Sequence, residues 1–100
     1  MAISEKDQRE MRSAICYAVT QYHIANALIK AALEIDAEWW PEFKRRDFLQ
    51  ESDLEKIGET EGYIMAAMRH LARTRKTITA LKAKLFEIEE AKHEQRNNAD

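Results

Sequence analysis

The amino-acid sequence predicts an all-α protein, and three observations lead to that fold class. Helix-breaking residues are rare, with two Gly and one Pro in 100 residues. Hydrophobic residues make up 45% of the chain and charged residues 34%, a balance that is typical of long packed helices. A seven-residue repeat, which keeps one face of a helix turned to a partner helix, is formed by Ile57, Ile64, Leu71, Ile78 and Leu85.

The first predicted element is a helix over about residues 4–40. Ser4 and Asp7 match a capping pattern in which a hydroxyl accepts a free backbone N–H at the start of a helix. Pro41 lacks an N–H and disfavours helical geometry in Trp40, so we expect the helix to end or bend there. Small residues at seven-residue spacing would let a neighbouring helix approach closely, namely Ala18, Ala25 and Ala32.

The apolar surface of this first helix is unusually wide. It covers about 240° of the circumference, against roughly 100° for an ordinary surface helix. One neighbouring helix cannot cover such an arc, so we predict self-association into a dimer with a four-helix-bundle or coiled-coil-like core. A compact monomer with an additional helix is the alternative. The residues predicted at the oligomer interface are Tyr17, Ile24, Leu28 and Ile35.

A short helix over about residues 41–50 and a long helix over about residues 53–94 complete the predicted chain. Ser52 and Glu55 form a second candidate capping pair. Gly58 and Gly62 each weaken a helix interior, so the long helix is expected to be continuous or kinked there, with a break as the alternative. The tail, 95–100, is expected to fray. The whole chain, 1–100, is then one domain, a long antiparallel helical hairpin with a short connecting helix.

Aromatic residues gather where the hairpin is expected to turn. Trp39, Trp40, Phe43 and Phe48 fall within ten residues, and Trp is common in binding hot spots. One hypothesis is a partner-binding site at this tip, consisting of Trp40, Phe43, Lys44, Arg45 and Arg46. The alternative is a hydrophobic plug that closes the end of the bundle.

A basic segment without acids lies between residues 69 and 84. Four of its cations share an arc of roughly 80° on the predicted helix. This stripe could contact nucleic-acid phosphates. A solvated face or an interhelical charge ladder is the preferred explanation, and the net charge of −2 does not indicate a nucleic-acid-binding chain. The four residues are Arg69, Arg73, Lys76 and Lys84.

The sequence carries no recognisable catalytic, cofactor-binding or metal-binding motif. Glu90 and His93 have the Glu-x-x-His spacing of di-metal bundles, but such sites need two of these motifs. Cys16 and His23 lie seven residues apart on one helix, about 10.5 Å, which is too far for a hydrogen bond. We therefore expect no enzyme activity, no metal and no cofactor.

The sequence indicates a cellular compartment and a general class of function, but no specific partner. The single cysteine excludes an internal disulfide and suits a reducing compartment, and no signal peptide or membrane span is recognised, so we expect a cytoplasmic protein. We predict a small helical protein–protein interaction module that acts as an adaptor, inhibitor or accessory regulator, of the kind that phages and mobile elements encode. Nucleic-acid binding and a purely structural oligomer are the alternatives.

Overall fold

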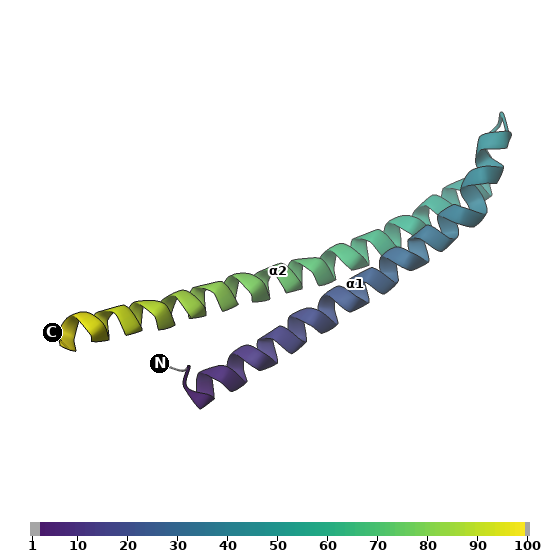
Figure 1. The fold of residues 1–100 in the computed structure, drawn as a ribbon. Helices are drawn as coiled ribbons and strands as arrows, with labels where there is room; N and C mark the ends of the chain where they lie inside the picture. Colours follow the sequence, from purple (N-terminus) through teal and green to yellow (C-terminus); the bar gives the residue numbers. More distant parts are fainter. Residues whose placement is uncertain (1–2, 100) are drawn as a thin grey trace.

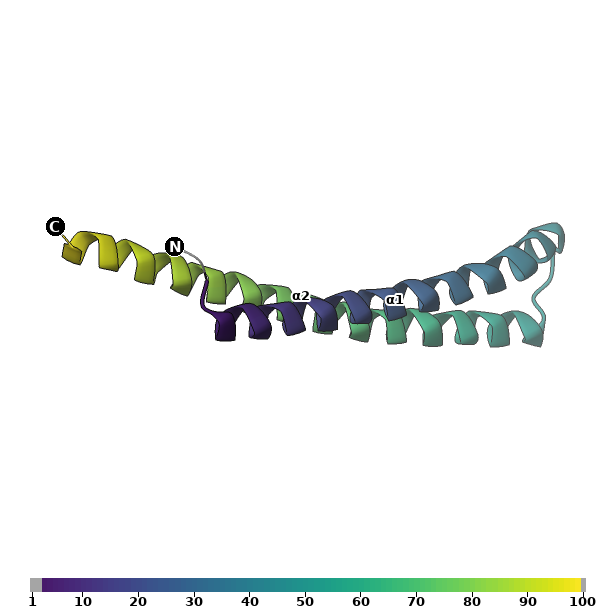
Figure 2. The same cartoon turned by 60° about the horizontal axis from the view of Figure 1, so that its bottom comes forward.

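The computed structural model describes residues 3–99 as two long helices, α1 (Glu5–Arg45) and α2 (Glu51–Ala99). They lie side by side and antiparallel in a hairpin that measures 78 × 20 × 16 Å (Figure 1). This confirms the predicted all-α hairpin. In Figure 2 the C-terminal end of α2 extends past the N-terminal end of α1. Within the described part of the chain, neither helix has a stretch long and apolar enough to cross a membrane.

The start of α1 is the predicted one, but its end is not. The Ser4 hydroxyl accepts the backbone N–H of Asp7 at 3.2 Å, which caps the first turn. The helix then passes through Pro41 and ends at Arg45, five residues later than expected. Ring contacts across the proline support this last turn, because Phe43 packs on Trp39 with ring centroids 5.2 Å apart. These contacts offset the backbone hydrogen bond that Pro41 cannot make.

The separate short helix predicted over 41–50 is not present. Its first half belongs to α1, and residues 46–50 form a non-helical connection. The predicted capping by Ser52 is also wrong, because Ser52 lies inside the first turn of α2. Asp53, at the third helical position, caps that turn instead and accepts the backbone N–H of Gln50 at 2.8 Å. Acidic residues in this turn also complement the positive end of the helix dipole.

The long second helix is continuous at the two glycines, where the sequence left a break as the alternative. Gly58 and Gly62 lie inside α2, and neither has a positive φ angle. The helix continues to Ala99, five residues beyond the expected end, so the described part of the predicted frayed tail is helical. Asp100 lies outside the described residues.

Small side chains separate the two helices. The buried apolar residues of the described chain are all alanines, so the backbones approach closely, as the alanine spacing in α1 predicts. On α2 the side chains that face α1 are those of a second seven-residue series, in which Ala67 and Thr74 are buried and Leu81 and Ile88 half-buried. The buried alanines are Ala18, Ala25, Ala32 and Ala67.

Candidate functional site

Polar contacts fix how the two helices are aligned. A hydrogen bond of 2.6 Å joins His70 Nδ1 to Gln21 Oε1, near the middle of the hairpin. Thr74 Oγ1 lies 3.4 Å from the carbonyl oxygen of Ala18. Toward the open end, Lys84 Nζ lies 3.0 Å from Asp7 Oδ1. Because a sliding of one helix would break all three contacts, they specify the register that the alanines alone would leave loose.

The repeat that first indicates a packing helix is not the seam of this hairpin. Its five side chains, the row from Ile57 to Leu85, are between 41% and 48% exposed. Each follows a seam position of α2 by four residues, which turns the row sideways from α1. The row is therefore not the contact with α1, and it forms a regular apolar stripe without a partner in this structure.

A matching row on α1 lies on the same side of the hairpin. Tyr22 and Leu71 each directly follow one residue of the hydrogen-bonded pair Gln21 and His70, and because the helices are antiparallel, their levels along the hairpin differ by about 3 Å. Equivalent positions on two antiparallel helices turn to the same side, because a two-fold rotation exchanges such helices. We call the combined surface the apolar face, and its members are Ile15, Tyr22, Ile29, Leu33, Ile57, Ile64, Leu71, Ile78 and Leu85, all of them exposed.

The predicted oligomer-interface residues fall into two pairs. Leu28 and Ile35 are half-buried at seam positions of α1, between the buried alanines, so they contribute to the contact with α2. Tyr17 and Ile24 are exposed, on the side of the hairpin away from the apolar face. The sequence thus located an apolar surface on α1, but the wider surface, shared by both helices, was missed. The five-membered row on α2 was the signal that could have found it.

At the tip, one buried carboxylate holds the turn together. Asp53 is fully buried and accepts hydrogen bonds from the Trp39 indole N–H at 2.8 Å and the Gln50 backbone N–H at 2.8 Å. Arg46 donates two more, one of them at 2.9 Å. The Arg46 guanidinium is the main cause that lowers the pKa of Asp53 below its usual value, against the opposing effect of burial. This network determines the position of the tip.

Of the five residues predicted to bind a partner at the tip, two are half-buried in the packing of the turn and three are exposed. Arg46 is held by Asp53, and Phe43 is half-buried against the tryptophans. Trp40 is exposed, with Lys44 Nζ 5.5 Å from its ring centroid. Arg45 is also exposed.

Two strongly exposed side chains at the tip were missed as site residues. Phe48 and Leu49 of the connection are 61% and 63% exposed, and together with the exposed Trp40 they add apolar surface at this end of the hairpin. We call Trp40, Phe48 and Leu49 the tip cluster. Phe48 and Leu49 lie in the non-helical connection, where the sequence predicts a short helix, and this explains why neither was chosen as a site residue. The cluster and the basic Lys44 and Arg45 form a mixed apolar and cationic end of the molecule.

The basic stripe is only partly free for a ligand. Lys84 forms the ion pair with Asp7, and this contact raises its pKa. Arg69, Arg73 and Lys76 are exposed and lie on α2 away from the apolar face. They line up along one helix, but no second basic element on α1 extends the stripe into a groove.

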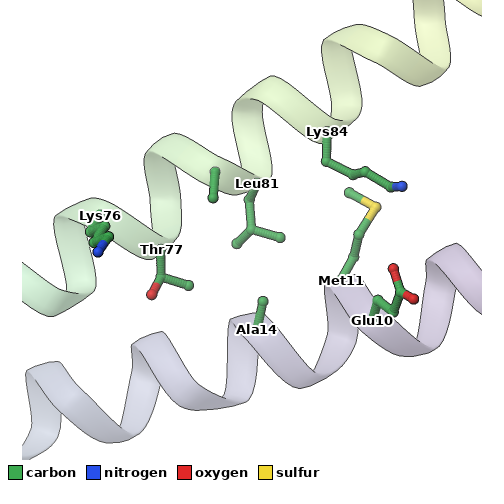
Figure 3. Close-up of a pocket in the computed structure, with 8 residues that line it drawn as sticks. Glu10, Met11, Ala14, Lys76, Thr77, Leu81 and Lys84 are labelled. Atoms are coloured by element: carbon green, nitrogen blue, oxygen red, sulfur yellow. The ribbon is translucent and has the colours of Figure 1, made fainter.

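An open groove of ≈ 320 Å³ lies between the helices near their free ends (Figure 3). Met11 and Leu81 point into it from the two helices, and Glu10 and Lys84 lie at its rim. Its lining is mostly apolar, with no arrangement of nucleophile and base. Among the described residues, no group of three His, Cys, Asp or Glu side chains could hold a metal ion.

Comparison with known proteins assigns no relationship. No protein-family model matches the sequence, and neither a curated protein nor a solved structure shows significant similarity to it.

Proposed function

We propose that the chain is a protein–protein interaction module, a self-associating helical hairpin that acts as an adaptor, inhibitor or accessory regulator. The observation that carries this proposal is the apolar face, where nine large side chains remain exposed along both helices. Contiguous apolar surface of this length is characteristic of interaction sites on small helical proteins. The single cysteine, Cys16, supports a reducing compartment such as the cytoplasm.

The size of the apolar face makes association energetically reasonable. Full burial of an Ile or Leu side chain contributes about 1.5–3 kcal/mol, so covering a half-exposed one contributes roughly 1 kcal/mol. Two copies of the nine-membered face would then gain on the order of 15–20 kcal/mol before costs. Association itself costs about 4–15 kcal/mol, so a dimer is favoured only if much of the face is covered.

The tip cluster supports the second half of the proposal, capture of another macromolecule. Phe48 and Leu49 lie in the connection at one end of the hairpin, beyond both helices that carry the apolar face, so self-association leaves them accessible. Exposed aromatic side chains beside Lys44 and Arg45 fit a partner surface that is apolar with acidic neighbours. The buried Asp53 network fixes the turn that presents them, which lowers the ordering cost of binding.

The test separates the two surfaces. Leu71→Asp places a charge in the centre of the apolar face and is expected to produce monomers, measured by light scattering. Ala72→Asp, at an exposed neighbouring position outside the face, is the matched control and should keep the oligomer. Phe48→Ala with Leu49→Ala should abolish recovery of a cellular partner while mass and helicity stay unchanged. An unchanged mass for the Leu71 variant would refute the role of the face.

Nucleic-acid binding stays a second candidate because Arg69, Arg73 and Lys76 are exposed on one side of α2. It predicts affinity that falls steeply with added salt. The pairing of Lys84 with Asp7 and the short length of the remaining stripe make it the weaker proposal. A purely structural oligomer would instead show self-association without any outside partner.

A further inference from the structure

We infer that the occupant of the apolar face is a second copy of this chain in a head-to-tail orientation, with α2 packed antiparallel on α2 near Leu71. This inference rests on the proposed self-association and specifies its geometry. Measured from the middle of the α1–α2 seam, which on α2 also includes the half-buried His70, Thr77 and Lys84, the apolar face lies roughly 70° around the helix, close to a quarter turn. That is the angle at which two hairpins stack into a square four-helix bundle.

The apolar rows on both helices have a common centre. On α2 the row from Ile57 to Leu85 is centred on Leu71, and on α1 the positions Ile15 and Ile29 are centred on Tyr22. Along the hairpin axis the Gln21–His70 hydrogen bond lies between Tyr22 and Leu71, each of which is about 1.5 Å from its level. A two-fold axis through this level would therefore set Ile64 near Ile78 of the second copy and Ile15 near Ile29 of the second copy.

The charges beside the row on α2 distinguish the possible orientations. Four residues after each of Ile57, Leu71 and Ile78 come Glu61, Arg75 and Lys82, and all three flank the row because such positions are neighbours on a helix. All three are exposed, and among the described residues none belongs to an ion pair within the chain.

In the head-to-tail orientation these charges are complementary. A centre near Leu71 brings Glu61 close to Lys82 of the second copy. The two-fold symmetry repeats the contact, so two acids meet two cations.

The head-to-head orientation is less favourable. It would place α2 on α1 of the second copy, at the level fixed by the Lys84–Asp7 ion pair. Lys82 would then lie at the level of Arg9 of the second copy and within one helical turn of its Arg12, and like charges oppose that arrangement.

The orientation has a functional consequence. Leu71 lies 21 residues from Gln50 at the start of α2, which corresponds to about 32 Å along the helix. A head-to-tail dimer would therefore present two tip clusters at opposite ends, roughly 60 Å apart. Such a molecule can connect two partner molecules, or two sites of one assembly, whereas a head-to-head dimer would present both tips together.

A distance measurement between spin labels tests this geometry. The chain is labelled at Asp47→Cys, an exposed position at the tip, after Cys16→Ser removes the native thiol. Double electron–electron resonance should then give a distance of roughly 60 Å between the labels of the two copies. A distance below about 30 Å, which two adjacent hairpin ends would give, would overturn the head-to-tail orientation. A label at Ala72→Cys, next to the proposed centre, should give a short distance and serves as the control.

Charge reversal provides a second, independent test. Glu61→Lys and Lys82→Glu should each weaken the dimer by roughly 3–10-fold in Kd, and the double variant should recover most of that loss. A double variant no tighter than the single ones would contradict the proposed contact. Light scattering on the unlabelled protein distinguishes failure of the proposed self-association from failure of the proposed orientation. A monomer refutes the self-association itself, whereas a dimer with short tip distances refutes only its orientation.

Discussion

The close packing of α1 on α2 through alanines can be tested with one enlarged side chain. Ala25 is 1% exposed and lies between the buried Ala18 and Ala32. Replacing Ala25 with Leu adds three carbon atoms where two backbones approach closely. Overpacking of this kind costs about 1–3 kcal/mol, and we expect the upper part of that range because the neighbouring helix must move. The shift would also strain the Gln21–His70 hydrogen bond nearby.

The assay is urea unfolding followed by circular dichroism, at one chain concentration because oligomer stability depends on concentration. The matched control is Ala27→Leu, an exposed position on the same helix, where Leu costs only a few tenths of a kcal/mol. The Ala25 variant should unfold at a clearly lower urea concentration with a similar slope. If both variants were equally stable, the helices would not meet at the alanines, and the proposed seam would be wrong.

Three further predictions concern α2, the tip and the basic stripe. Gly58→Ala and Gly62→Ala should each stabilise the protein by about 0.5–1 kcal/mol in urea unfolding, because both lie in a helix interior and a Cβ there meets nothing within 4 Å; a loss of stability would contradict the continuous helix. Since Arg46 and its neighbours lower the pKa of Asp53 below 3.8, its contribution is complete at neutral pH and is lost as the pH falls below about 4, so Asp53→Asn should lower stability at pH 7 and reduce the loss between pH 7 and pH 3. Arg73→Ala with Lys76→Ala should leave the oligomer mass unchanged, and any retention on DNA that survives both changes at low salt would rule out the basic stripe as its cause.

The sequence predicted the architecture because the signals for it are local. Few helix breakers, the Ser4 cap and the alanine spacing each act within one helix, and the structure retains all three. The end of α1 was missed because Pro41 was weighed without the ring contacts of Phe43, which depend on the packing around it. The start of α2 was misplaced by two residues, since Asp53 rather than Ser52 supplies the cap.

The candidate site could be predicted only in part. The row from Ile57 to Leu85 was visible in the sequence, but periodicity does not state which neighbour a stripe faces. Which stripe of α2 faces α1 depends on polar contacts between residues about 50 positions apart, such as Gln21 with His70. It also depends on small residues such as Thr74, which pack between the helices. At the tip, Arg46 was a site candidate until its contact with the buried Asp53 showed its structural role.

The most direct measurement is the absolute mass of the protein in solution by light scattering. The chain has a mass of 11.7 kDa, and an apolar face covered by a second copy predicts twice that value. The Leu71→Asp variant should return to 11.7 kDa with its helicity retained. A wild-type protein that keeps the mass of one chain as its concentration is raised would leave the apolar face uncovered and contradict self-association.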